Sequence, residues 1–335
     1  MSNNNDSIDF DEWLNREAAE WDDASGGLKD LLRSIGQAAI QIYKEITGAG
    51  LAGMLGSEGR MNVQGEEVQK MDARANQIFI DTLQAAGVCA GIVSEENEHV
   101  VVFDDGKSLR SEYVFLMDPI DGSGNIDVNI SIGSIFSIYR RLSSPGSRVA
   151  EQDFLQPGKN QVAAGYFLYG PTINWILATT NSVNAFTLSR PDNRFFLSFP
   201  HLKAPLRGPF YSFDNHNYNR VDQSIRNYVN YCMSDTQNTY GPYSNRYYGC
   251  MVADVHRNLL KGGIYFYPQT KDKPNGKLRI CYECNPMAFI IEKAGGSATD
   301  GRQRILEIHP EHIHQRSPLF IGSREMVKEL IAFGD

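Results

Sequence analysis

The chain of 335 residues is long enough for two domains, and its 41% hydrophobic and 11% aromatic content excludes a largely disordered protein. The formal net charge of −8 disfavours a protein that binds nucleic acid or anionic lipid. A small phosphorylated ligand, held by a few local cations or by metal ions, is compatible with this charge.

The cysteines and the apolar runs predict where the protein resides. Five cysteines are few and odd in number for this length, which predicts reduced thiols rather than a secreted disulfide framework. No apolar run reaches the roughly 20 residues of a membrane helix, and the acidic start lacks a signal-peptide core. We therefore expect a soluble, cytoplasmic protein.

The first half of the chain predicts alternating helices and strands. Residues 1–12 are rich in Asn and Asp, so we expect a frayed end. Apolar residues at helical spacing predict a helix over 27–47, and the glycines of 48–65 predict a mobile loop that acts as a lid. A second helix is expected over 66–86. Expected strands follow at 88–93, 100–103, 113–117 and 130–139.

The second half repeats this mixed character and predicts an α/β protein. Expected strands are 162–169, 175–179, 185–188 and 264–267, and expected helices are 221–233, 253–260 and 286–293. A proline-rich, basic segment after Phe199 predicts two domains, 1–199 and 200–335.

Acidic residues stand where apolar segments end. Glu95 and Glu96 follow "AGIVS", Asp118 and Asp121 follow "YVFLM", and Glu283 lies in "LRICYECNP". Open α/β sheets bind ligands at the carboxyl ends of strands, and Mg²⁺ pairs carboxylates with substrate phosphates. This pattern predicts metal-assisted phosphate chemistry, with an ordinary set of strand-ending surface acids as the alternative.

The segment between the paired aspartates predicts how they converge. We expect Pro119 to stop the strand, so that the chain turns and Asp118, Asp121 and the carbonyl of Ile120 meet at one point. The following Gly122-Ser123-Gly124 predicts a concavity of backbone N–H groups that holds a phosphate.

The segment "DPIDGSGNID", which begins at Asp118, resembles the class I fructose-1,6-bisphosphatase family. The likeness runs from about residue 25 to residue 324. It includes "NVQGEEVQKMD" from Asn62, "SEE" from Ser94, "FSIYRR" from Phe136, "DFLQPG" from Asp153, "QVAAGYFLYG" from Gln161, "MVADVHRNLLKGGIYFYP" from Met251, "GKLRICYECNPMAF" from Gly276 and "HQRSPLFIGS" from His314. The resemblance implies a layered αβαβα sandwich of two mixed α/β domains, with the active site at their interface.

The resemblance also implies the roles of individual residues. The Mg²⁺ ligands would be Glu95, Asp118, the Ile120 carbonyl, Asp121 and Glu283, with Glu66 assisting a further metal; about two or three Mg²⁺ ions are expected per subunit, and Mn²⁺ is an alternative. Asp72 and Glu96 would orient and deprotonate the attacking water, with Asn62 supporting the closed loop. The 1-phosphate would lie on Asp121, Gly122, Ser123 and Gly124 beside Arg279, and the sugar and 6-phosphate would contact Lys277, Asp214, Arg246, Tyr247, Tyr265 and Tyr267.

Three departures from the family pattern modify these expectations. Gly124 replaces a serine that contributes mainly a backbone N–H. Asp214 stands where the family has an asparagine beside the 6-phosphate, so we expect Asn215 or Asn217 to take over, or a different sugar preference. Asp272 replaces a cation, with Lys271 and Lys273 as substitutes.

The family's AMP inhibitor site also departs from the pattern. The residues at its positions include Gly27, Lys29 and Arg140, and Glu112 stands in place of a phosphate-facing lysine. Because a carboxylate repels a phosphate, we expect weak or absent inhibition by AMP.

The resemblance thus implies a Mg²⁺-dependent enzyme that hydrolyses the 1-phosphate of fructose 1,6-bisphosphate in gluconeogenesis. Sedoheptulose 1,7-bisphosphate is the alternative or second substrate. In the family Arg246 reaches into a neighbouring subunit, which implies a homo-oligomer, usually a tetramer. Two alternatives from other classes are a redox protein built on Cys281 and Cys284, and a non-catalytic regulator. The regulator would lack one of six carboxylates that are all present: Asp72, Glu95, Glu96, Asp118, Asp121 and Glu283.

Overall fold

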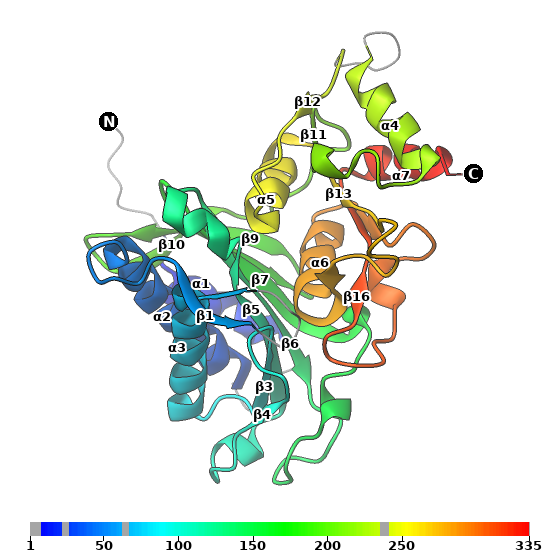
Figure 1. Ribbon diagram of the computed structural model, residues 1–335. Helices are drawn as coiled ribbons and strands as arrows, with labels where there is room; N and C mark the ends of the chain where they lie inside the picture. The colour runs from blue at the N-terminus through cyan, green and yellow to red at the C-terminus, as the bar shows by residue number, and fades with distance from the viewer. Residues whose placement is uncertain (1–7, 22–26, 62–66, 235–240, 335) are drawn as a thin grey trace.

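The protein is a five-layer α/β sandwich, described here from a computed structural model that covers residues 8–21, 27–61, 67–234 and 241–334. Two sheets alternate with three layers of helices (Figure 1). The expected αβαβα architecture of two mixed α/β units is confirmed. None of the described helices combines the length and the apolar composition needed to cross a membrane.

The large sheet lies in the N-terminal part of the chain. Its strand order is β10-β9-β8-β7-β6-β5-β3-β4, and only the β3–β5 pair is parallel. The strands are β3 Gly91–Ser94, β4 Val101–Val102, β5 Tyr113–Asp121, β6 Ile132–Arg140, β7 Gln161–Tyr169, β8 Ile173–Thr179, β9 Val183–Ser189 and β10 Arg194–Phe199. All seven strands expected in this region therefore form, with boundaries shifted by a few residues, and β10 is an additional strand.

The small sheet lies in the C-terminal part, with the order β12-β11-β13-β17-β15. Its strands are β11 Phe210–Ser212, β12 Ser244–Asn245, β13 Ile264–Tyr267, β15 Ser297–Thr299 and β17 Leu319–Gly322. A separate pair, β14 Leu278–Arg279 and β16 Arg316–Ser317, supports the segment that leads to Glu283. The predicted boundary at Phe199 falls between the last strand of the large sheet and the first of the small one.

The first helical layer covers one face of the large sheet. It contains α1 Phe10–Glu17, α2 Gly27–Gly48 and α3 Lys70–Ala86. The predicted apolar stripe of α2 is buried, and its Gly36 lies so close to the sheet that an added Cβ would be 3.1 Å from Trp175. The expectation of a frayed end is wrong from Phe10 onward, because Phe10 packs on Trp175 with ring centroids 4.3 Å apart.

The second helical layer separates the two sheets, and the third covers the small sheet. The middle layer contains α5 Met251–Lys261 and α6 Asn285–Lys293, whose apolar side chains contact both sheets. The outer layer contains α4 Gln223–Met233 and α7 Arg324–Ala332, which pack on the aromatic side chains of the small sheet. Because α5 and α6 are wedged between the sheets, residues at their N-terminal ends face strand ends of the large sheet.

Two expectations near the glycine-rich segment need correction. Residues 57–61 form the strand β1 Ser57–Met61, which pairs with β2 Glu67–Gln69, so the region 48–65 is not loop throughout. The second helix begins at Lys70 rather than at 66, because 67–69 are extended in this pair. Its start is held by Asp72, whose Oδ2 accepts a hydrogen bond from the Gln69 N–H at 3.2 Å.

Candidate active site

The β3–β5 pair brings the first acidic residues together. Ser94 is paired with Met117, and the Glu95 N–H donates to the Met117 carbonyl at 3.1 Å. Because the two strands are parallel, Glu95 and Asp118 lie next to each other at the carboxyl end of β3. The side chains of both residues are buried.

Pro119 bends the strand but does not stop it, contrary to the expectation from sequence. β5 continues to Asp121, and its pairing with β6 shifts register between Asp118 and Asp121. A proline, which has no N–H to donate, is tolerated at such a bulge. The Pro119 carbonyl accepts a hydrogen bond of 2.6 Å from Ser134. Asp118 and Asp121, on either side of the bulge, line the same cavity.

Glu283 approaches from the C-terminal part on a π-helical turn, Ile280–Cys284, that leads into α6. Its Oε2 accepts a hydrogen bond from the Arg279 N–H at 2.6 Å. Short π-helical turns are frequent at functional sites because they re-aim single side chains. The two halves of the chain therefore each supply carboxylates to one site.

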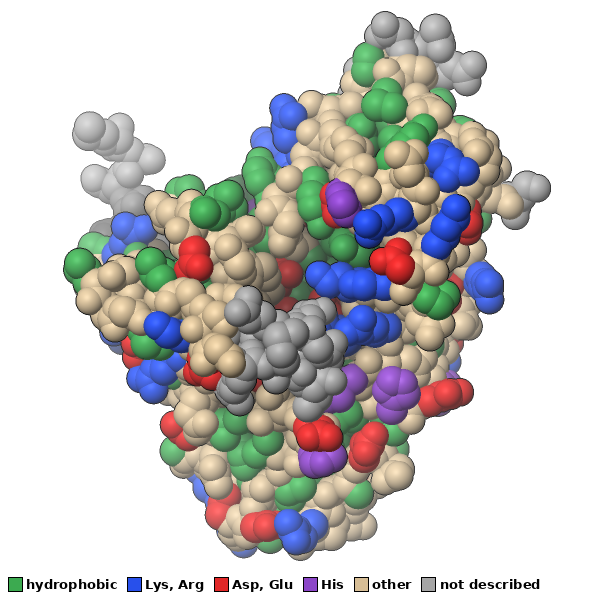
Figure 2. All heavy atoms as spheres, viewed as in Figure 1, with side chains coloured by type: hydrophobic (Ala, Val, Ile, Leu, Met, Phe, Trp, Pro, Cys, Tyr) green, Lys and Arg blue, Asp and Glu red, His purple; other side chains and the backbone are tan. Residues whose placement is uncertain are grey.

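These residues line a cavity of about 250 Å³ between the two halves. Figure 2 shows this hollow, with acidic side chains in its depth and Lys and Arg side chains beside it. The predicted residues that line it are Glu95, Asp118, Ile120, Asp121, Gly122, Ser123, Gly124, Tyr247, Tyr265, Tyr267, Lys277, Arg279 and Glu283. Most of the predicted metal-binding and substrate-binding residues are thus brought together.

Burial and mutual repulsion favour the protonated forms of the clustered acids. Burial raises the pKa of Asp118 well above its usual range, and the negative charges of Glu95 and Asp121 raise it further. Burial raises the pKa of Glu283 to about 8, although the charge of Arg279 opposes the shift. Burial also raises the pKa of Asp121, against hydrogen bonds to its carboxylate from the Val252 N–H at 2.7 Å and the Cys250 thiol at 3.0 Å.

Arg279 places a positive charge beside this cluster of carboxylates. Its Nη2 lies 2.5 Å from Glu95 Oε1, and its Nη1 lies 3.6 Å from Glu283 Oε2. Within the described part of the chain, no three His, Cys, Asp or Glu side chains are grouped as a ready-made metal cage. The donor set nevertheless suits a hard cation, since it consists of buried carboxylate oxygens.

The turn after Asp121 has the geometry that glycine allows. Gly122 has φ 78°, and a Cβ on it would lie 2.7 Å from the Cys250 Cβ. Gly124 differs, because a Cβ there would meet nothing within 4 Å. The structure would accept a serine at position 124, so this departure from the family pattern has no steric cause.

The predicted water-activating pair lies beside the cavity rather than in its lining. Asp72 is buried in the first turn of α3, and burial raises its pKa to about 8. The charge of Glu96 raises the pKa of Asp72 further, whereas a hydrogen bond from Ser123 lowers it. The other two predicted members of this group, Asn62 and Glu66, lie outside the described residues.

The predicted tyrosines Tyr247, Tyr265 and Tyr267 line the cavity, but two other predicted substrate-binding residues do not. Asp214 lines a neighbouring cavity of about 180 Å³, which shares Tyr267 and Lys277 with the first. Its carboxylate accepts from the His216 N–H at 3.0 Å and from Asn217 Nδ2 at 3.1 Å. Arg246 is not among the described residues that line the cavity of its own chain.

Sequence reasoning missed several residues at the start of α5. Gly249 and Met251 line the cavity, and the Cys250 thiol donates a hydrogen bond to Asp121. Leu278 of β14 also lines the cavity. The family motif that begins at Met251 indicated that this region matters. Its role in holding Asp121 is visible only from the contacts of Cys250 and Val252 with that carboxylate. Cys281 and Cys284, by contrast, are buried free thiols, and burial raises the pKa of Cys281 to about 12, which does not suit a reactive redox pair.

The arrangement can bind a phosphate, neutralise its charge and activate a water molecule, because carboxylates, cations and a glycine turn share one cavity. Comparisons with known proteins agree with this chemistry. The family model described as "Fructose-1-6-bisphosphatase, N-terminal domain" matches residues 12–200, and the corresponding C-terminal model matches residues 204–335. The crystal structure of Leishmania major fructose-1,6-bisphosphatase in holo form matches with a TM-score of 0.91 and 34% identity, over 98% of this chain and 99% of that one. The chain therefore belongs to the fructose-1,6-bisphosphatase family and is a phosphoric monoester hydrolase.

Proposed function

We propose that the protein removes the 1-phosphate of fructose 1,6-bisphosphate in a Mg²⁺-dependent reaction, releasing fructose 6-phosphate and inorganic phosphate. The observation that carries this proposal is the cavity whose lining combines four carboxylates and the 122–124 turn with Lys277 and three tyrosines. The carboxylates and the turn suit the phosphate that reacts, and Lys277 and the tyrosines suit the sugar and its second phosphate.

Glu95, Asp118, Asp121 and Glu283, with the Ile120 carbonyl, are the proposed ligands of the cations. Their clustering supports this assignment, because three of these carboxyls have raised pKa values that a nearby divalent cation would lower. When bound, Mg²⁺ or Mn²⁺ supplies positive charge to the phosphoryl oxygens and to the leaving sugar oxygen.

Asp72 and Glu96 are the proposed acceptors of the proton from the attacking water. Burial, and then the charge of Glu96, raise the pKa of Asp72 to about 8, which makes its carboxylate a stronger base toward the proton of water. Arg279 and Lys277 contribute positive charge beside the phosphate, and the N–H groups of Ser123 and Gly124 orient it.

The distal end also supports sedoheptulose 1,7-bisphosphate as an alternative substrate. Asn217 lines the neighbouring cavity and is bonded to Asp214, whereas Asn215 is exposed, so Asn217 is the proposed substitute for the family's asparagine. Arg220 and Lys273 line the same cavity and would receive the phosphate of a longer sugar. Rates measured side by side on the two bisphosphates test the assignment, and a higher kcat/KM on sedoheptulose 1,7-bisphosphate would reverse it.

Two further parts of the proposal concern the assembly and the cellular setting. Because Arg246 does not line its own cavity, it is proposed to serve a neighbouring copy in a homo-oligomer. Light scattering tests whether this oligomer is a tetramer. The proposed setting is gluconeogenesis in the cytoplasm.

A non-catalytic regulator would bind the bisphosphate without turnover, so measurable phosphate release excludes that alternative.

A further inference from the structure

The segment between β12 and α5, residues 246–250, links the two ends of the active site. It carries Tyr247, which lines the cavity, and ends at Cys250, whose thiol contacts Asp121. Tyr248 is 48% exposed, so the segment is not held by burial of its side chains alone. Contacts to its backbone therefore contribute to its position.

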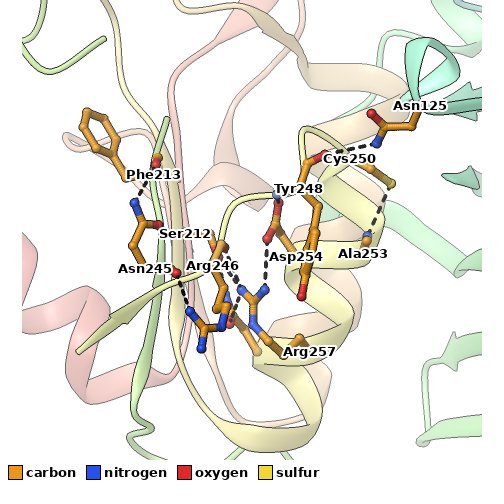
Figure 3. A network of polar contacts seen from close by, with 11 residues as sticks. Asn125, Ser212, Phe213, Asn245, Arg246, Tyr248, Cys250, Ala253, Asp254 and Arg257 are labelled. Atoms are coloured by element: carbon orange, nitrogen blue, oxygen red, sulfur yellow. Dashed lines mark hydrogen bonds and ion pairs between the residues drawn. The ribbon is translucent and has the colours of Figure 1, made fainter. Parts of the chain in front are cut away.

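Three side chains make those backbone contacts (Figure 3). Arg257 Nη2 donates to the Arg246 carbonyl at 3.1 Å, and Asp254 Oδ2 accepts from the Tyr248 N–H at 3.0 Å. Asn125, in the turn that follows Gly124, donates to the Tyr248 carbonyl at 3.0 Å. The segment is thus fixed on one side to α5 and on the other to the turn proposed to hold the 1-phosphate.

Asp254 and Arg257 form an ion pair on α5. Arg257 Nη1 lies 3.1 Å from Asp254 Oδ1, and the Asp254 side chain is fully buried. Arg257 also donates to Ser212 Oγ at 2.5 Å, at the end of β11, and its guanidinium lies 5.6 Å from the centroid of the Tyr248 ring. The pair therefore ties α5, the small sheet and the 246–250 segment together.

A role in helix stability alone does not account for these contacts. An acid in the first turn of a helix commonly caps the helix's own N–H groups. Here one carboxylate oxygen of Asp254 binds the Tyr248 N–H outside the helix, and Arg257 binds a carbonyl and a hydroxyl outside it. Neither residue lines the cavity, so neither touches the substrate.

We propose that Asp254 and Arg257 are positioning residues that hold Tyr247 in place for the distal phosphate of the substrate. This inference rests on the proposed function. Small displacements of a binding group lower affinity and rate steeply, so loss of the pair should weaken binding at the distal end. The proximal phosphate should be affected much less, because Asp121, which precedes its turn, keeps the hydrogen bonds from Cys250 and Val252.

The test compares Arg257→Lys with wild type by steady-state kinetics on fructose 1,6-bisphosphate and by product inhibition. Lysine keeps the charge but cannot make the forked contacts of a guanidinium. We expect the KM and the inhibition constant of fructose 6-phosphate to rise about tenfold, while kcat and the inhibition constant of inorganic phosphate stay within about twofold. Asp254→Asn, which keeps an acceptor for Tyr248, should show the same selectivity with a smaller effect.

The matched control is Arg226→Lys. Arg226 also donates to a main-chain carbonyl, that of Val221 at 2.6 Å, but it lies on α4 away from the cavity. Its replacement should leave all four constants within about twofold of wild type. Equal rises in both inhibition constants, or no rise in either variant, would overturn the positioning role. A wild-type protein that releases no phosphate from the bisphosphate would instead overturn the proposed function, and this inference with it.

Discussion

Arg279 contacts Glu95 at the centre of the cavity, with Nη2 2.5 Å from Oε1 and both side chains largely buried. A buried ion pair that loses one partner leaves an uncompensated charge, which costs about 3–5 kcal/mol. Glu283 also lies within reach of Arg279, so one arginine compensates two carboxylates from different halves of the chain.

Replacement of Arg279 should therefore destabilise the metal-free protein. We expect Arg279→Met to lower the free energy of unfolding in EDTA by about 3 kcal/mol, and Mg²⁺ to restore part of the loss. Urea unfolding with and without Mg²⁺ measures both values. The exposed Arg302→Met serves as the control and should change stability by less than about 0.5 kcal/mol. Equal losses in the two variants would contradict the compensating role.

The stability of the metal-free protein should fall as pH rises from 6.5 to 8. Burial raises the pKa values of Asp72 and Glu283 to about 8, so both bind a proton more tightly in the folded than in the unfolded state. Their contribution is complete at low pH and is lost as pH rises through about 8. His256 acts in the opposite direction only at lower pH, because burial lowers its pKa from 6.5 to about 4.

Unfolding free energies across this pH range, in EDTA and in Mg²⁺, test the prediction. The bound cation stabilises the carboxylates, so the decline should be smaller with Mg²⁺. A free energy of unfolding that rises between these pH values in EDTA would show that the two carboxyls are not buried in this way.

The Cys250 thiol should act through its hydrogen bond to Asp121. It donates to Asp121 Oδ2 at 3.0 Å, and its sulfur accepts from the Ala253 N–H at 3.4 Å. Cys250→Ser keeps a donor and should retain activity within about threefold, whereas Cys250→Ala should lower kcat about tenfold. Cys281→Ser is the control and should leave turnover unchanged. An effect of Cys281→Ser as large as that of Cys250→Ala would favour the redox alternative.

The enzyme should be insensitive to micromolar AMP. Glu112 forms an ion pair with Arg140, which also lies over the Tyr113 ring at 5.4 Å from its centroid. These are the positions at which the family pattern predicts contacts with the AMP phosphate, and here the arginine is already paired with an acid. Glu112→Lys should increase inhibition in an assay of phosphate release. Strong inhibition of the wild type by micromolar AMP would contradict this account.

The parts of the fold that follow from local pattern could be predicted from the sequence. The apolar stripe of α2 and the buried strand β5 could be predicted because the spacing of apolar residues along the chain indicates both. Asp118 and Asp121 could be assigned to the site because they come directly after an apolar run, Tyr113–Met117. Glu283 could be singled out as an acid within an apolar segment, but its role as a ligand came from the resemblance, because its π-helical turn has no local signature.

Features that depend on long-range contacts could not be predicted. The continuation of β5 through Pro119 requires its pairing with β6, and β2 forms only because residues 57–61 lie beside it. The roles of Cys250 and Asp254 depend on Asp121 and Tyr248, which lie on other segments. Spacing along the chain carries no information on such contacts.

The most direct test of the central claim is phosphate release from fructose 1,6-bisphosphate, with and without Mg²⁺, by the wild type and by Asp118→Ala. Asp118 is buried among the carboxylates of the cavity, so its replacement should remove a proposed cation ligand and leave Lys277 and the tyrosines in place. We expect Mg²⁺-dependent release by the wild type and a rate at least about 100-fold lower for the variant. Equal release with and without Mg²⁺, or an active Asp118→Ala enzyme, would contradict the account.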